Sequence, residues 1–278
     1  MTSFLQQKPS KAARLQFWAL GGILLLLALP WFIGLLADSG KAYEVRVPAA
    51  LQPPSSSEWF GTDSLGRSQW HRALVGTEVS LRVVSGALLI ALPLSLVLGC
   101  IAGATAGRWL DQIISWFIAL LHTVPFFLLV VAIAAVIGPG TMILPWLVGG
   151  VIWAPAARLV RTEAIRILQG RFVRASVAYG ASPAQVFSRG LLPLATPPAA
   201  VSLFYLVPEI IGIDAILTLL GLGPKPPTPS LGALVFDGIR RWDSAPWLAG
   251  GPCLLLIAIC LSIHFLADQI AAQLSPMS

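Results

Sequence analysis

Two carboxylates lie inside one otherwise apolar stretch of this 278-residue chain, and they are its most unusual chemical groups. Glu209 and Asp214 fall within residues 194–220, which carry no other charge. A charge at the centre of a membrane helix costs about 2.5–3.5 kcal/mol, so such residues usually face a bundle interior or a water-filled cavity. They lie five residues apart, about 140° around a regular helix, and cannot share one face unless nearby Pro208 distorts it. Two interpretations stay open: the acids line a polar path through the membrane, or one or both pair structurally with an arginine of a partner subunit.

The histidines and cysteines lack the spacing of a metal site or a redox motif. His122 and His264 lie in apolar stretches and His71 lies outside them, and none has a second ligand at metal-binding spacing. We therefore expect satisfied polar residues at helix interfaces and no metal bound by this chain alone. The cysteines also lie in apolar stretches without CxxC spacing (Cys100, Cys253 and Cys260).

The sequence also bears on enzymatic functions. An intramembrane hydrolase would pair a membrane serine with His122 or His264, but no Gly-x-Ser-Gly arrangement occurs in an apolar stretch. The chain contains no GxxxxGK[ST] phosphate loop, so any ATP-driven step needs another chain. The hydrolase is kept as the alternative function, and a self-contained channel is a third option.

Composition places these residues in a membrane. Hydrophobic residues make up 56% of the chain and charged residues only 11%, whereas a soluble domain carries about 25% charge. This excludes a soluble fold, a disordered chain, a nucleic-acid-binding domain and a disulfide-stapled secreted fold. The net charge is +6.

Six apolar stretches have the length that a membrane-spanning helix needs, roughly 17–25 residues. They cover residues 17–36, 83–106, 113–137, 141–157, 194–220 and 244–267. The first is read as a retained helix rather than a signal peptide, and Gly138-Pro139-Gly140 predicts a tight turn. We therefore expect an all-α membrane protein with both termini on one side.

The distribution of basic residues selects the cytoplasmic side. The side of the termini holds ten Lys and Arg residues against eight on the other side, and those between 158 and 189 form a compact cluster. Cytoplasmic loops carry the excess of Lys and Arg. We predict a cytoplasmic N-terminus (1–16), an extracytoplasmic loop with an amphipathic segment (37–82) and a cytoplasmic tail (268–278).

Residues 158–193 are too polar for lipid and follow the pattern of two short helices. A first helix is predicted over residues 171–179, ended by Gly180 in the left-handed conformation. Ser182 as N-cap and Pro183 at the first helical position predict a second helix, ending around Gly190. The segment is either a docking element or an ordinary loop held by its arginines to anionic lipid.

Within that segment, Arg174-Ala175-Ser176-Val177-Ala178-Tyr179-Gly180 is followed by Leu192-Pro193, with the proline thirteen residues after the glycine. This pattern resembles the EAA loop of ABC-importer permeases: EAA, three residues, Gly, nine residues, I-x-L-P. The spacing is kept, whereas Arg174, Ser176 and Gly190 replace the usual Glu, Ala and Ile.

Two further segments strengthen the resemblance. Phe60-Gly61-Thr62-Asp63-Ser64-Leu65-Gly66-Arg67, continued by Arg72, Gly76, Ser80 and Leu81, resembles the FGTDxLGRD…R…G…SL segment of C-type permeases in the peptide/nickel importer family, with Ser68 replacing the usual acid. Leu219-Leu220-Gly221-Leu222-Gly223 and Pro226-Pro227-Thr228-Pro229-Ser230-Leu231-Gly232 resemble that family's FLGLG…PPxPxWG signature, with Leu219 for Phe and Leu231 for Trp. Together the three motifs cover residues 60–232.

The resemblance implies a transport subunit that does no covalent chemistry. The expected fold is that of type I ABC importer permeases, with a five-helix core over residues 83–267 and a coupling loop at 158–193. The expected cargo is peptides, nickel or metal-chelator complexes. The implied partners are a homologous second permease, two cytoplasmic ATPase subunits that bind ATP and Mg²⁺, an extracytoplasmic binding protein and membrane lipid, without nucleic acid. This chain needs no cofactor, and its location is the bacterial inner membrane, as a multi-pass protein.

The resemblance also assigns expected roles to residues. ATPase coupling falls to Arg171, Arg174, Ala175, Ser176, Gly180, Ala181, Ser182, Leu192 and Pro193. The outer loop or gate contains Gly221, Gly223, Pro227 and Pro229, in a proline-rich stretch whose backbone would be unsatisfied in lipid. Glu209 and Asp214 are the candidates for the translocation path.

Overall fold

The computed structural model describes residues 11–138 and 143–274, and over these residues the protein is helical, with one isolated bridge between Thr62 and Ser68. The elements are α1 (Lys11–Leu36), α2 (Ser39–Tyr43), η2 (Val47–Ala49), α3 (Gln69–Ala104), α4 (Trp109–Thr123), α5 (Phe126–Ile137), α6 (Leu144–Leu168), α7 (Arg171–Ala178), α8 (Pro183–Val186), η3 (Phe187–Leu191), α9 (Leu192–Tyr205), α10 (Val207–Leu219), α11 (Leu231–Ile239) and α12 (Trp247–Leu274). The all-α prediction is confirmed. Residues 1–10, most of the predicted turn at 138–140, the start of the predicted fourth span and the last four residues lie outside the described residues.

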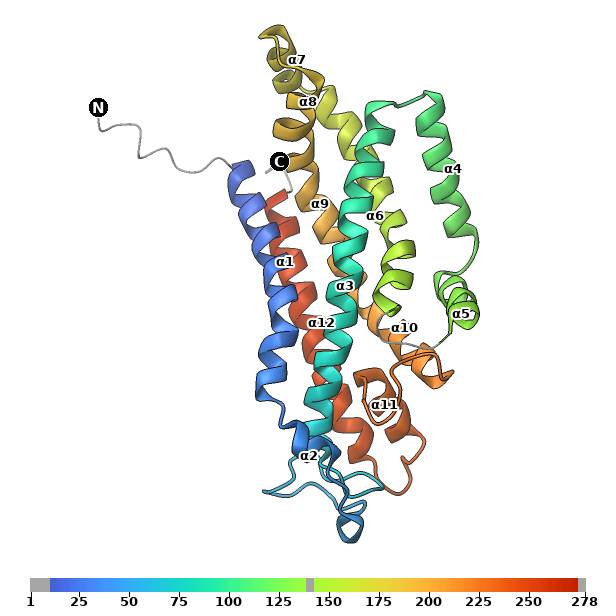
Figure 1. Cartoon of the computed structure of the whole chain (residues 1–278). Coiled ribbons are helices and arrows are strands. Elements are labelled where there is room, and N and C mark those ends of the chain that lie inside the picture. The colour runs from blue at the N-terminus through green and yellow to red at the C-terminus, as the bar shows by residue number, and fades with distance from the viewer. Residues whose placement is uncertain (1–10, 139–142, 275–278) are drawn as a thin grey trace, which may run out of the picture.

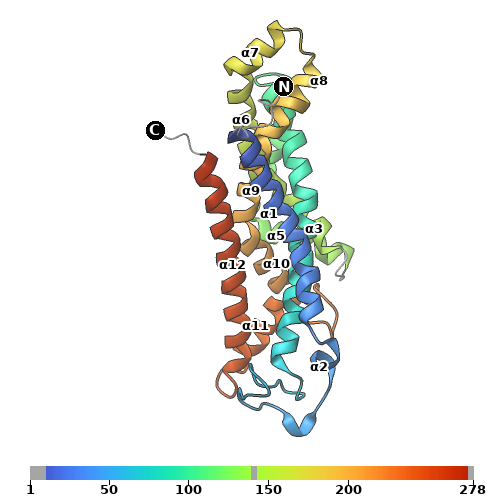
Figure 2. The ribbon, with the colours of Figure 1, turned by 90° about the vertical axis from the view of Figure 1, so that its left-hand side faces the viewer.

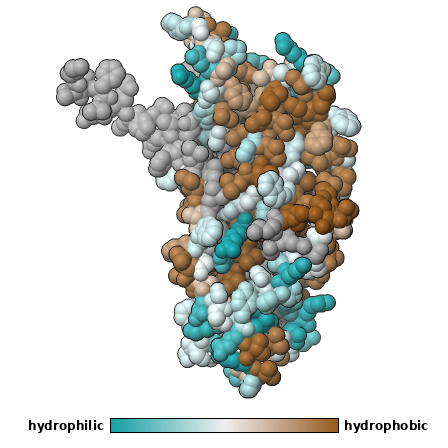
Figure 3. All heavy atoms as spheres, viewed as in Figure 1, coloured by the Kyte–Doolittle hydropathy of each residue, from teal (hydrophilic) through white to brown (hydrophobic). Residues whose placement is uncertain are grey.

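The long helices run side by side and leave two different ends (Figure 1). The start of α1, the end of α12 and the projecting pair α7 and α8 lie at one end, and Figure 2 shows the same grouping from the side. At the opposite end, residues 37–68 form a folded cap that contains α2. Figure 3 shows an apolar surface over the middle of the molecule and hydrophilic side chains over the cap. Such a band is expected of a protein solvated by lipid.

Close packing of α3 against α6 forms the centre of the molecule. A Cβ atom on Gly99 would lie 2.6 Å from Cβ of Val160, and one on Gly103 would lie 2.4 Å from Cβ of Ala164. Small residues at these positions let the two helices approach closely. The resulting van der Waals contacts stabilise helix pairs in lipid, where the hydrophobic effect does not drive helices together.

An ion pair adds a tie between α4 and α6 near the projecting end. Arg161 donates through Nε to Oδ1 of Asp111 at 2.5 Å and through a terminal nitrogen to Oδ2 at 2.8 Å. Asp111 is buried and also accepts from the backbone of Gly107. This two-point geometry is the strong form of an arginine–carboxylate contact.

Two described helices, α3 and α12, are each long and apolar enough to cross a membrane, and two bent pairs could each make one more crossing. The prediction of one continuous helix over residues 113–137 is wrong, because α4 and α5 meet at an 87° bend. Pro125 explains the break: proline lacks the N–H donor, and it disfavours the helical conformation of the preceding residue.

The predicted helix over residues 194–220 is also divided. It consists of α9 and α10, bent by 42° at Leu206 and followed by Pro208 in the first turn of α10. The second short helix of the loop does not end around Gly190 as predicted, but continues through the π-helical turn η3 into α9. A proline ring clashes with the carbonyl four residues before it in a regular helix, and the wider π turn accommodates Pro193 without a break.

Candidate functional site

The turn between α7 and α8 has the local structure that its sequence predicts, both at Gly180 and at Ser182. Gly180 has φ +84°, and no atom lies within 4 Å of the position that its Cβ would take. Ser182 accepts a hydrogen bond from the Gln185 backbone, and the Gln185 side chain accepts one from the Ser182 backbone. This capping box starts α8 directly after the corner, so the angle between α7 and α8 is set by local chemistry.

The surface of this loop is exposed although much of it is apolar or small. Val177 and Tyr179 are 56% and 93% exposed, and Ala175 and Ala178 are exposed beside them. A groove of about 510 Å³ lies between α7 and α8, with Ser176, Gly180 and Ala181 among its lining residues. Exposed apolar surface on a polar projection is typical of a docking surface.

The predicted coupling residues divide into two groups. Arg171, Arg174, Ala175, Gly180 and Ser182 are exposed on the projection, and Ser176 and Ala181 are half-buried at the groove. Leu192 and Pro193 lie instead in the first turn of α9, at the root of the projection. The two groups are joined by η3, where Gly190 and Leu191 are buried.

Glu209 lies in a cavity that forms where two helix pairs bend, beside a proline inside the continuous helix α6. The cavity has a volume of about 210 Å³ and is lined by His122 and Pro125 at the α4–α5 bend, Pro155 inside α6, and Leu206 and Glu209 at the α9–α10 bend. Glu209 and His122 are both exposed. Interrupted helices at membrane depth are tolerated where they line a cavity, and they commonly form the binding sites of transporters.

Asp214 lies elsewhere, in a buried polar cluster. It is 1% exposed, and its Oδ2 accepts a hydrogen bond of 3.0 Å from Oγ of Ser80 on α3. The same Ser80 Oγ accepts the backbone N–H of Leu231 at the start of α11. The structure therefore separates the two acids: Asp214 joins α3, α10 and α11 within this chain, and Glu209 faces the cavity.

The outer proline-rich loop packs tightly on α10. A Cβ atom on Gly223 would lie 2.2 Å from Oγ1 of Thr218, and one on Gly232 would lie 2.2 Å from Cβ of Ala215. Ser230 caps α11 by accepting from the Ala233 backbone. Gly223 and Gly232 thus permit close approach, whereas Gly221 has φ +76° and open space around the position of its Cβ. Pro227 and Pro229 lie in the loop between α10 and α11.

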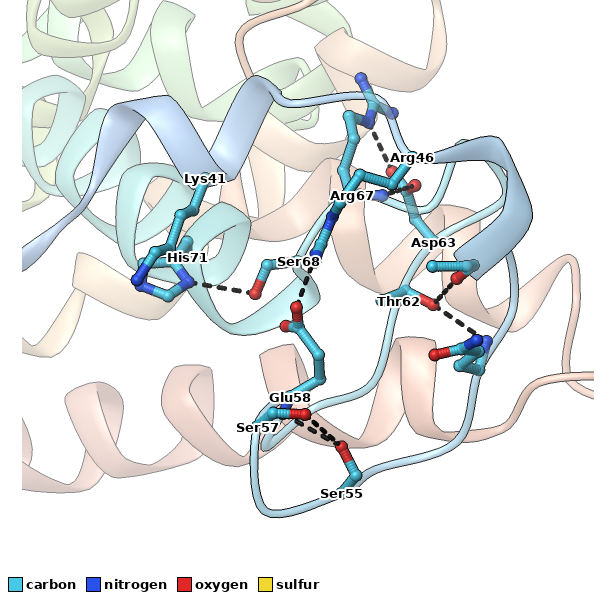
Figure 4. Close-up of polar contacts among 12 residues, drawn as sticks. Lys41, Arg46, Ser55, Ser57, Glu58, Thr62, Asp63, Arg67, Ser68 and His71 are labelled. Atoms are coloured by element: carbon cyan, nitrogen blue, oxygen red, sulfur yellow. Dashed lines mark hydrogen bonds and ion pairs between the residues drawn. The ribbon is translucent and has the colours of Figure 1, made fainter.

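The cap is organised by Asp63 (Figure 4). Its Oδ1 accepts from the backbones of Leu65 and Arg67 at 2.9 Å each, and its Oδ2 accepts from Nε of Arg67 at 2.7 Å. Gly66 follows with φ +72°, and its Cβ would lie 1.8 Å from the carbonyl oxygen of Arg46. Only glycine fits there, which gives this motif a structural role.

A second ion pair holds the outer part of the cap. Arg46 donates to Oε1 of Glu58 at 2.5 Å. Burial alone would raise the pKa of Glu58, but hydrogen bonds from Ser68 and Arg46 and the positive charge of Arg46 lower its pKa below the ordinary value. Glu58 is therefore ionised over the neutral pH range and contributes to the folding of the cap.

The membrane histidines are satisfied within their own helices. Nδ1 of His122 lies 2.7 Å from the carbonyl oxygen of Ile118, and Nδ1 of His264 lies 3.0 Å from that of Cys260. No cluster of three metal-ligating side chains occurs among the described residues.

Comparison with known proteins adds to this geometry. A family model described as the binding-protein-dependent transport system inner membrane component matches residues 95–276. The chain belongs to this family. It is therefore the permease subunit of an ABC importer and not itself an enzyme, with ATP hydrolysis in separate subunits. The permease interpretation is confirmed, and nothing favours the hydrolase.

Curated relatives match most of the chain. The dipeptide transport system permease protein DppC of Lactococcus lactis is 30% identical over 89% of this chain and 72% of its own length. DppC of Bacillus subtilis is 33% identical over 81% of this chain and 70% of its own, and DppC of Alkalihalophilus pseudofirmus is 31% identical over 99% and 88%.

Sequence reasoning missed two features of these sites. It did not bring His122 together with Glu209, because contacts between residues so far apart in the sequence follow from the helix bends. It also gave no role to Asp63. An aspartate side chain commonly accepts a hydrogen bond from the backbone N–H two residues further along the chain, and this forms a turn.

Proposed function

We propose that this permease forms, with a second permease, the path for peptides across the bacterial inner membrane, driven by two cytoplasmic ATPase subunits. Peptides are the cargo because the matched relatives are named for dipeptide and oligopeptide transport. Nickel transport has no comparable support. An extracytoplasmic binding protein would deliver the peptide to the cap end.

In this proposal the chain crosses the membrane six times. Four crossings are α3, α12 and the two bent pairs, whose length and composition suit a membrane. The proposal adds α1 and α6 as the other two. The projecting end is cytoplasmic, because the basic cluster around Arg158, Arg166 and Arg171 is at that end. The cap then faces the outside.

The observation that carries the proposal is the continuous connection from the exposed loop to the cavity. The α8, η3 and α9 segments join end to end, and α9 stops at Leu206, which lines the cavity with Glu209. The ATPase subunits would dock on α7 and α8, and their closure on ATP would move α9. Glu209 would lie on the translocation path, while Asp214 would hold the outer loop in place.

The experiment is a substitution of Gly180 in the assembled transporter. Gly180→Val meets no steric clash but forces a β-branched residue to positive φ, at a cost of about 1–3 kcal/mol. We expect loss of ATP-driven peptide uptake and of co-purifying ATPase subunits, with normal amounts of permease in the membrane. Gly180→Asn should retain most uptake, because asparagine tolerates this conformation.

The matched control is Gly107→Val. Gly107 has φ +78° and equally open surroundings, but it lies in the α3–α4 turn outside the coupling loop. ATPase subunits should still co-purify with this variant. Normal uptake by Gly180→Val at normal expression would refute the coupling role.

A further inference from the structure

A second polar cavity lies at the cap end, remote from Glu209. It has a volume of about 300 Å³ and is formed by the cap, the first turn of α3 and the end of α11. Its charged lining consists of four arginines and two aspartates (Arg67, Arg72, Arg240, Arg241, Asp63 and Asp237). The cavity belongs neither to the coupling loop nor to the helix bends.

The charges around this cavity are unbalanced. Asp63 is already occupied by Arg67 and two backbone N–H groups. Arg240 and Arg241 line the cavity and are exposed, and among the described residues neither side chain has an ion pair or hydrogen bond. Four guanidinium groups against two carboxylates leave a surplus of positive charge, and guanidinium groups bind carboxylates at two points.

Two buried groups of the lining lack hydrogen-bond partners. Nε of Arg72 lies 3.4 Å from Oδ2 of Asp63, within ion-pair range, but donates no hydrogen bond, and the Arg72 side chain is only 7% exposed. Gln69 is 2% exposed and donates through Nε2 to the carbonyl of Leu248, but its Oε1 accepts nothing. Buried polar groups nearly always have partners. Solvent does not reach either of these atoms, so the guanidinium groups that a ligand would meet first are those of the exposed Arg240 and Arg241.

We propose that this cavity binds the carboxyl end of a peptide. A peptide C-terminus carries a carboxylate, an anion that the arginines of the lining can bind at two points. The inference rests on the proposed function in taking peptides as cargo, and it makes the cap end a subsite for that cargo.

The test measures binding of tri-alanine and its C-terminal amide to the assembled transporter in nanodiscs. Each peptide is titrated without binding protein, and the thermal unfolding midpoint reports occupancy, because a ligand of the folded state stabilises it. We expect the amide to bind about tenfold more weakly, since a charge-assisted hydrogen bond is lost. Arg240→Gln and Arg241→Gln should weaken binding of tri-alanine and leave that of the amide unchanged.

Two variants give the experiment matched controls. Lys225→Gln removes an exposed cation from the outer loop but not from the cavity lining, so binding of both peptides should stay as in the wild type. Asp237→Asn removes a negative charge from the lining and should tighten binding of tri-alanine. Weaker binding of tri-alanine in Arg240→Gln and tighter binding in Asp237→Asn would show an effect of charge, because a loss of folding would weaken binding in both variants.

Equal affinity for tri-alanine and its amide would overturn the inference, as would equal weakening of both by the arginine variants. The unfolding midpoint could instead rise with phosphatidylglycerol in the nanodisc, do so less in Arg240→Gln, and not change with tri-alanine. That result would assign the cavity to lipid and would also overturn the inference. ATP-driven peptide uptake is measured separately in proteoliposomes. Its absence from the wild type would count against the proposed function, whereas uptake with binding insensitive to the C-terminus would remove only this subsite.

Discussion

Asp214 and Glu209 show how two acids on one short helix come to serve different purposes. Both lie in α10, five residues apart, which places their side chains about 140° from each other around the helix. Glu209 faces the cavity at the helix bends, whereas Asp214 faces α3 and is covered. The bend at Leu206 changes the direction of α10 relative to α9 without bringing the acids onto one face.

The Asp214 cluster gives a prediction for Ser80. Ser80→Ala removes the donor to Asp214 and the acceptor for the Leu231 backbone, so two buried groups lose a partner. We expect the free energy of unfolding to fall by about 1–3 kcal/mol. Ser262→Ala serves as the control in a denaturation measurement, because exposed Ser262 bonds only a carbonyl of its own helix. Equal stability of the two variants would show that Asp214 does not depend on Ser80.

At the scale of elements, the cap is a small polar structure that leads into the start of α3. Asp63 holds the turn before α3, and Arg46 and Glu58 join two distant parts of the loop. Its stability therefore depends on ionised groups as well as on the aromatic contacts of Trp59 and Phe60 with Trp70.

This composition predicts that acid loosens the cap. The folded-state pKa of Glu58 is lowered, so its contribution to stability is present above the ordinary pKa and is lost as the pH falls through the folded value. We expect hydrogen-exchange protection factors of residues 44–68 to fall as the pH drops from 7 to 3. In Glu58→Gln the protection should be lower at neutral pH and depend less on pH. A wild-type cap with constant protection would rule out this role.

For the whole molecule, the decisive prediction is its orientation in the membrane. Ser182→Cys places a thiol on the exposed projection, and Ser57→Cys places one on the exposed cap. A membrane-impermeant maleimide should label Ser57→Cys in intact spheroplasts and Ser182→Cys only in inverted vesicles. The native cysteines lie in the helices α3 and α12, so the unsubstituted chain gives the background. The reverse pattern would invert the proposed topology.

The sequence predicted what depends on local chemistry. Apolar length indicated the helices, and Gly180 and Ser182 indicated the corner between α7 and α8, because their roles depend only on immediate neighbours. The sharp bend before Pro125 and the π turn before Pro193 were missed, because a proline inside an apolar run can kink, break or widen a helix. The cavities were missed since each collects residues from several helices.

The π turn has a mechanical consequence if α7 and α8 are the docking site proposed above. The segments α8, η3 and α9 follow one another without a loop. A tilt of the chain near Pro183 would therefore be passed on as far as Leu206, because no flexible loop lies between them. These segments would act as a lever whose only hinge lies three residues from Glu209. Nucleotide binding and hydrolysis outside the membrane could then change the angle between α9 and α10 inside the bilayer.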